Sequence, residues 1–197
     1  MRFADRFPRQ LSALQADYIR SGHAYHNWDH VTALLGHFER LYGRFEDPLA
    51  VETALYYHDV IYVPGAKDNE RRSAARLRAE MNGHLDAVTL DRAEAIVLAT
   101  ETHTLPETGD PALSRDCALF LDMDLAILGA RRDRFDAYNT GIREEYQSVP
   151  DELFYPARQN VMRSFLEREK LFVTDEFQAS HDARARENLR RLVGDLP

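Results

Sequence analysis

The pair His58 and Asp59 is the first feature of this sequence that suggests chemistry. It interrupts an otherwise apolar stretch between Leu55 and Tyr62. Burying an imidazole beside a carboxylate is costly unless the two groups pair with each other or bind a cation. A helix cap next to a hydrogen-bonded core histidine would also explain the pair, so both interpretations stay open at this point.

Three more residues could belong to the same site. His30 lies at the border of an apolar helical stripe, and Asp122 and Asp124 interrupt the most hydrophobic segment of the chain, residues 118–125. Aspartate is unfavourable inside a helix. Two such acids in a core helix need a positive partner, which an arginine or a metal ion can supply.

The segments that would carry these residues have helical spacing. Apolar residues recur three, four and seven positions apart after Val31, which predicts a helix that Asn27 caps and Gly43 ends. Asp47 and Pro48 are typical of an N-cap and a first helical residue, and predict a helix that runs to between Tyr57 and Val60.

The remainder of the chain also has helical patterns. We predict six more helices, which run from Asp68 to Asn82, from Asp91 to about Thr102, from Asp110 to about Gly129, from Arg131 to Gln147, from Glu152 to Lys170 and from Asp182 to Leu192. Alternating β-branched residues between hairpin turns are absent, and no linker or repeat divides the sequence. The prediction is an all-α fold of about eight or nine helices, in a single domain over residues 1–197.

The amino-acid composition limits the classes of binding partner and the cellular compartment that we expect. The chain has 25 basic and 33 acidic residues and a net charge of −8, whereas proteins that bind duplex nucleic acid are usually basic. A single cysteine, Cys117, excludes an internal disulfide and fits a reducing compartment. No apolar run reaches the roughly 20 residues that cross a bilayer, and the first residues lack an apolar signal segment. We therefore expect a cytoplasmic protein with neither a nucleic-acid nor a membrane partner.

Several short segments, in this order, resemble the HD superfamily of metal-dependent phosphohydrolases, in the branch of predicted HD phosphohydrolases. They are 25–30 (YHNWDH), 57–62 (YHDVIY), 68–74 (DNERRSA), 100–103 (TETH), 120–129 (FLDMDLAILG) and 142–146 (IREEY). Each motif is weak alone, and the resemblance depends on their combination and order, which cover nearly the whole chain.

The resemblance implies a compact HD-type helical domain that holds one divalent metal ion. Its ligands would be His30, His58, Asp59 and a later aspartate, for which we favour Asp124 and keep Asp122 as the alternative. Residues two apart on a helix point about 200° apart, so both cannot bind one ion without distortion. Two imidazoles and two carboxylates suit Mn, Fe, Co, Ni, Zn or Mg, and the identity of the metal stays open.

The implied reaction is hydrolysis of a phosphomonoester or phosphoanhydride in a small phosphorylated substrate, in this family a nucleotide, by metal-activated water. Three residues are candidate catalytic groups: Asp59, Glu70 and His103. Four are candidates for substrate binding: His26, Asp68, Arg71 and Arg143. An ordinary acidic helix start would explain Asp68 and Glu70 equally well.

Two other functions stay open. A di-iron oxygenase on the same scaffold would need extra ligands such as His84 and His103, but His84 is typical of a helix C-terminus, so we expect one metal rather than two. A non-catalytic nucleotide-binding or regulatory HD module would keep the metal without turnover. The C-terminal helix could close the core or pair with a second copy in a homodimer.

Overall fold

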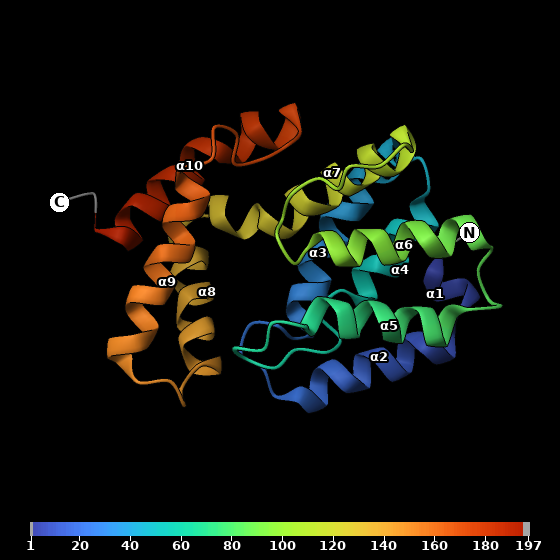
Figure 1. The fold of residues 1–197 in the computed structure, drawn as a ribbon, viewed down its shortest axis with the longest axis horizontal. Helices are drawn as coiled ribbons and strands as arrows, with labels where there is room; N and C mark the ends of the chain where they lie inside the picture. Colours follow the sequence, from blue (N-terminus) through green and yellow to red (C-terminus); the bar gives the residue numbers. More distant parts are fainter. Residues whose placement is uncertain (1, 195–197) are drawn as a thin grey trace. The chain divides into compact units, whose positions relative to one another are not determined.

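The computed structural model describes residues 2–194, which form ten α-helices and two 3-10 helices without a strand (Figure 1). The prediction of an all-α fold is confirmed. The two helices beyond the eight predicted ranges are α1 (Phe3–Arg6) and α2 (Pro8–Ser21). Pro8 takes the first turn of α2, where a missing N–H costs nothing. Within the described residues, no helix is both long and apolar enough to cross a bilayer.

The chain divides into two compact units, Met1–Met123 and Asp124–Pro197. The boundary falls inside α7 (Pro111–Leu125), so Asp124 lies on the last turn of a helix that begins in the first unit. The single domain that we expect over residues 1–197 stays a prediction.

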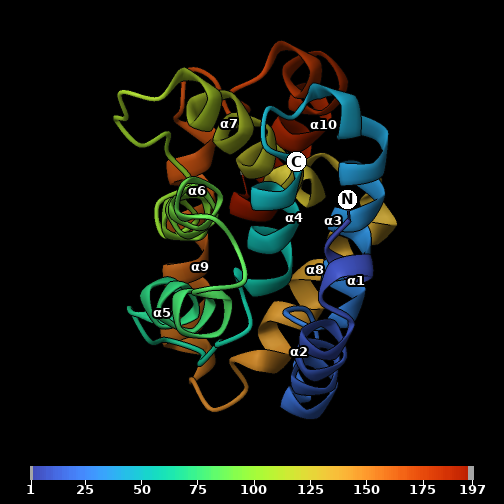
Figure 2. The ribbon, with the colours of Figure 1, turned by 90° about the vertical axis from the view of Figure 1, so that its right-hand side faces the viewer.

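Helix α4 (Pro48–Tyr57) forms the centre of the first unit. All eight of its residues from Ala50 to Tyr57 are buried. Around it pack α3 (Trp28–Leu41), α5 (Asn69–Met81) and α6 (Ala87–Ala99), and the 3-10 helix η1 (Tyr42–Arg44) follows α3. Figure 2 looks almost along α5 and α6, with α4 standing across them. This arrangement holds the end of α4, where His58 follows, inside the unit.

Two predicted helix starts are confirmed by their caps. The side chain of Asn27 accepts hydrogen bonds from the backbone N–H groups of Asp29 and His30, at 2.8 and 3.4 Å. The side chain of Asp47 accepts one from Ala50 N–H at 3.0 Å. Such bonds satisfy donors that have no partner within the helix. The two capping side chains therefore set where α3 and α4 begin.

Two other predicted starts are wrong. Helix α6 begins at Ala87 rather than Asp91, because Asp86 accepts the N–H of Thr89 at 3.0 Å and caps the helix one turn earlier. Helix α10 (Asp175–Val193) begins seven residues before Asp182, after a cap in which Thr174 Oγ1 accepts the N–H of Phe177 at 3.5 Å. In both cases a capping residue upstream of the apolar pattern sets the start.

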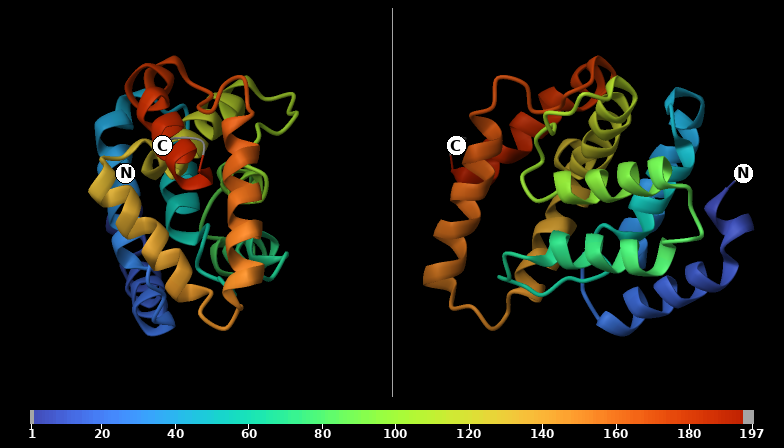
Figure 3. Two further views of the ribbon diagram at one scale, coloured as in Figure 1. Left: turned by 90° about the vertical axis from the view of Figure 1, so that its left-hand side faces the viewer. Right: turned by 45° about the vertical axis from the view of Figure 1, so that its right-hand side comes forward.

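The second unit is built from η2 (Ala126–Gly129), α8 (Arg132–Glu145), α9 (Asp151–Leu166) and α10. Helices α8 and α9 diverge from the loop at 146–150 that joins them (Figure 3). Helix α10 packs on η2 and α9. The amide of Asn188 donates to the carbonyls of Leu128 and Ala130 at 2.9 and 3.0 Å, which ties α10 to η2.

Candidate metal centre

His58 follows the last residue of α4, and its side chain is almost fully buried. Its Nδ1 lies 2.9 Å from the carbonyl oxygen of Leu55. Because a carbonyl only accepts hydrogen bonds, Nδ1 carries the proton and donates it. When the ring is neutral, the other nitrogen, Nε2, has its lone pair available, which is the tautomer that a metal-binding histidine needs.

His30 brings a second imidazole to the same place from the first turn of α3. Its Nε2 lies 3.1 Å from Nε2 of His58, and its ring lies against Tyr25 with 5.0 Å between the centroids. The Asn27 cap orders the backbone on which His30 stands. Two buried imidazoles therefore face each other through the same ring atom.

Asp59 adds a carboxylate beside both rings. Its Oδ2 lies 3.1 Å from Nε2 of His58 and 3.6 Å from Nε2 of His30. Burial raises the pKa of this carboxyl, but the neighbouring imidazoles of His58, His26 and His30 together hold it well below its usual range. Asp59 is therefore an ionised carboxylate that faces the two imidazoles.

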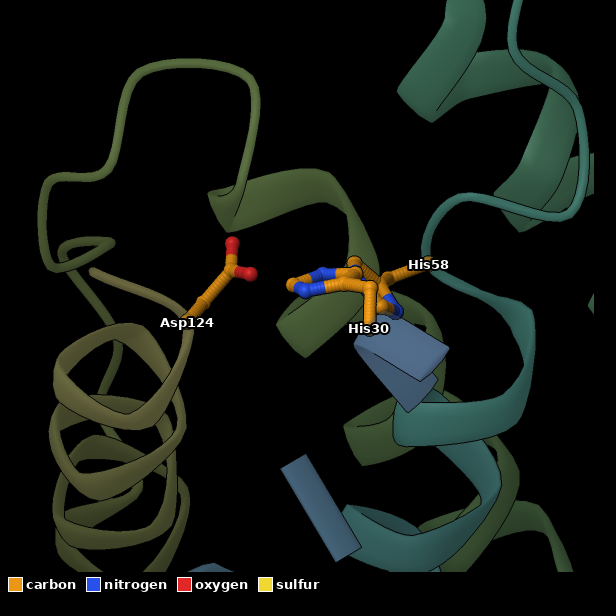
Figure 4. A group of neighbouring side chains, drawn as sticks. All are labelled: His30, His58 and Asp124. Atoms are coloured by element: carbon orange, nitrogen blue, oxygen red, sulfur yellow. The ribbon is translucent and has the colours of Figure 1, made fainter. Parts of the chain in front are cut away.

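Asp124 completes a group of three possible ligand residues with His30 and His58. One ligand atom from each of these residues lies within 4.8 Å of the other two, and the carboxylate of Asp124 faces the imidazoles (Figure 4). Helix α7 contacts His58 inside the first unit, where the ring of Phe120 lies edge-on with 5.7 Å between the centroids. Asp124 stands one turn further along the same helix.

Asp122 is buried but does not belong to this group. The two aspartates are separated by about 200° around the helix axis, so a helix that turns one toward the histidines turns the other away. Of the two aspartates, only Asp124 lies in the group of possible ligands among the described residues, and its role as a metal ligand stays a prediction.

The donor atoms suit a divalent ion. Two nitrogen ligands that bind one ion at about 2.1 Å and at a right angle lie about 3.0 Å apart, close to the 3.1 Å between the two Nε2 atoms. The same spacing suits an N–H···N hydrogen bond when His30 carries its proton on Nε2, and a bound cation would replace that proton. Two neutral imidazoles with carboxylates form a donor set that transition metals accept.

Three further histidines that the sequence analysis considered for the site are His26, His84 and His103. His26 stacks on Tyr62, with ring centroids 3.7 Å apart and planes at 20°, and its ring lies 6.3 Å from that of His30. His103 follows α6 with a φ of +50°, a left-handed conformation that histidine adopts more readily than most residues. Neither His103 nor His84 belongs to the group of ligand atoms among the described residues.

The candidates on α5 and α8 are more exposed. Asp68 is exposed and Glu70 is half-buried at the start of α5. Arg71 pairs with Glu101 at 2.8 Å on the surface. Arg143 donates to Asp151 at 2.6 Å and to the carbonyl of Tyr146 at 2.7 Å, and so closes the loop between α8 and α9. These bonds explain Arg143 structurally, and its role in substrate binding stays a prediction.

Two buried residues of α5, Asn69 and Ser73, were not predicted as site residues, although both lie in the segment 68–74. They stand four residues apart and share a face with the buried Ala74 and Leu77. A polar pair at this spacing on an apolar face is the signal that could have indicated them, because buried polar groups need partners.

Comparisons with protein-family models, with curated proteins and with solved structures found no match for this chain. The resemblance to the HD superfamily therefore rests on the order of the motifs alone and stays a prediction. At those motifs the structure brings together His30, His58 and Asp124, a group that could hold a metal ion; Asp59 is not part of this group but lies beside both imidazoles.

Proposed function

We propose that this protein is a metal-dependent phosphohydrolase of the HD type. Its substrate would be a small phosphomonoester or phosphoanhydride, with nucleotides as the first class to test. The observation that carries the proposal is the meeting of His30, His58 and Asp124 within 4.8 Å, with Asp59 against both imidazoles. The resemblance of the motifs to HD phosphohydrolases supplies the reaction class.

Four side chains would hold the ion: His30 and His58 through Nε2, and Asp59 and Asp124 through carboxylate oxygens. When bound, a divalent ion supplies positive charge that lowers the pKa of water and neutralises charge on a phosphate. The hydrogen bond from His58 to Leu55 keeps that imidazole oriented with Nε2 toward the site before anything binds.

Other residues of the chain would act on the substrate. His26, next to His30 and Asp59, offers imidazole N–H groups that can donate to phosphate oxygens.

In hydrolysis, an oxygen–phosphorus bond forms to water while the bond to the leaving oxygen breaks. One proton must pass from the water to a base, for which Glu70 and His103 are candidates besides Asp59, and the leaving oxygen must gain a proton. The binding partner of the protein would be this small anionic substrate, and the protein would act in the cytoplasm.

Metal analysis of the purified protein tests the proposal first, by elemental analysis and by titration with Mn²⁺. A panel of nucleoside mono-, di- and triphosphates and p-nitrophenyl phosphate is then assayed with Mn²⁺, Mg²⁺, Co²⁺, Ni²⁺, Fe²⁺ and Zn²⁺. We expect release of phosphate or pyrophosphate with one metal per chain.

The matched variants are His58→Ala and His37→Ala. His37 lies on α3 beyond His30, where it hydrogen-bonds Arg40. His58→Ala should abolish metal binding and turnover, whereas His37→Ala should change neither. Nucleotide binding without turnover under every metal would overturn the proposal in favour of a regulatory module. Two irons per chain with oxygen consumption would overturn it in favour of an oxygenase.

A further inference from the structure

The loop that carries Asp59 is held by two side chains of α5. Asn69 accepts a hydrogen bond from Val63 N–H at 3.0 Å and donates one to the carbonyl of Val63 at 3.1 Å. Ser73 accepts one from Ile61 N–H at 3.1 Å and donates one to the carbonyl of Ile61 at 3.3 Å. Each side chain thus satisfies both backbone groups of one loop residue. We call this pair of residues the α5 clamp.

Tyr62 lies between Ile61 and Val63, and its backbone carbonyl is bound by a residue outside the α5 clamp. The carbonyl of Tyr62 accepts a hydrogen bond from Nε2 of His23 at 3.0 Å. The His23 ring also lies edge-on to the Tyr62 ring, with centroids 5.3 Å apart. The backbone of residues 61–63 is therefore gripped by α5 through residues 61 and 63 and by His23 through residue 62.

The ring of Tyr62 in turn stacks on His26, at 3.7 Å and 20°. Stacked rings restrict each other's rotation, because any turn of the imidazole about its side-chain bonds would lose the contact. His26 also meets the ring of Tyr25 edge-on at 5.0 Å. The imidazole is thus held between two tyrosines on the side of the site where His30 and Asp59 lie.

We infer that Asn69 and Ser73 are positioning residues for His26. By fixing residues 61–63 they hold the ring of Tyr62 against the imidazole, and so keep His26 beside the candidate metal centre. The expected effect on turnover rests on the proposed function, whereas the placement of His26 does not.

The placement can be measured by NMR of the full-length protein with isotope-labelled histidine, with His26 assigned by its loss in His26→Gln. Because His26 lies over the face of Tyr62, its ring protons should resonate upfield. Tyr62→Leu should remove this shift, and Asn69→Ala and Ser73→Ala should reduce it. Ser73→Thr, which keeps the hydroxyl, should retain it.

The control variant is Ala75→Gly, on the exposed side of the same helix. It weakens α5 without touching the clamp, so the His26 signals should stay unchanged. Unchanged His26 signals in Tyr62→Leu, or unchanged signals in both Asn69→Ala and Ser73→Ala, would overturn the inference. Tyr62→Leu alters a partly exposed loop residue, so it tests the stack even if Asn69→Ala does not fold.

A double-mutant cycle on turnover separates positioning from a general structural role. If Asn69 acts through His26, Asn69→Ala should lower kcat/KM in the wild-type background and cause no further loss in His26→Gln. Equal losses in both backgrounds would overturn the inference. If no phosphoester is hydrolysed but the His26 signals respond as expected, the proposed function fails while the assignment of the clamp stands.

Discussion

The Nε2 atoms of His30 and His58 lie 3.1 Å apart although 28 residues separate them in the chain. Each imidazole is fixed by an interaction at a helix end. The Asn27 cap orders the first turn of α3 under His30, and the Leu55 carbonyl orients His58 after α4. The pair is therefore in place before a ligand arrives, which reduces the ordering that binding would require.

The two late aspartates should differ in their effect on metal binding. Asp124→Asn removes a possible ligand and should weaken Mn²⁺ binding by more than about 100-fold, beyond the range usual for outer partners of a metal site. Asp122→Asn should leave Mn²⁺ affinity within about tenfold of wild type, at the lower end of that range. Isothermal titration with Mn²⁺ measures both. A larger loss in Asp122→Asn than in Asp124→Asn would contradict the assignment.

Glu52 should matter for stability through the N-terminal segment. Its buried carboxylate accepts hydrogen bonds from Phe3 N–H at 2.8 Å and from the guanidinium of Arg2 at 2.9 Å. Glu52→Gln places an amide N–H₂ among these donors and should lower the free energy of unfolding by about 1–3 kcal/mol. Urea denaturation measures this change.

The matched control is Glu39→Gln, the other carboxylate on Arg2, at 2.7 Å. The Glu39 side chain is 57% exposed, so the change should cost less than about 1 kcal/mol. Equal effects of the two substitutions would show that burial of Glu52 does not decide its contribution.

Gly129 should not tolerate a side chain. A Cβ there would lie 2.7 Å from Cβ of His181 and 2.8 Å from its carbonyl oxygen, so α10 would have to move away from η2. We expect Gly129→Ala to lower the free energy of unfolding by about 1–3 kcal/mol. Gly36→Ala, in α3 with nothing within 4 Å of the added Cβ, should instead raise it by about 0.5–1 kcal/mol. Denaturation curves with the same sign for both would contradict the packing of η2 on α10.

The thiol of Cys117 should be unreactive in the folded protein, and its ionisation at high pH should destabilise the fold. Burial raises the pKa of its thiol from 9.0 to about 12. Since the folded pKa exceeds the unfolded one, the stabilising contribution of the neutral thiol is full below about pH 9 and is lost as the pH rises through about 12. The stability of wild type relative to Cys117→Ala should therefore fall by at most about 1.4 kcal/mol per pH unit above pH 9.

Urea denaturation at pH 8 and pH 11 measures this difference. The comparison cancels the effect of Tyr56, whose pKa burial also raises, to about 12. A thiol reagent should label Cys117 only after denaturation. A difference in stability that stays constant with pH, or rapid labelling of the native protein, would contradict a buried neutral thiol.

The sequence alone determined the features that depend on near neighbours. Asn27 and Asp47 indicated the starts of α3 and α4 because a cap bonds N–H groups only two or three residues away. Apolar spacing likewise indicated an all-α chain. Where a cap lay upstream of the apolar pattern, as at Asp86, the predicted start was late by four residues, Asp91 against Ala87.

Tertiary structure decided what depends on how helices pack against one another. Spacing places Asp122 and Asp124 on different sides of α7, but only the rotation of that helix against His58 turns Asp124 toward the imidazoles. The bonds of Asn69 and Ser73 to residues 63 and 61 also join a helix to a loop, and no local pattern specifies that pairing. Helical periodicity fixes angles within one helix, whereas the distance and rotation between two helices depend on how their side chains interlock in the core.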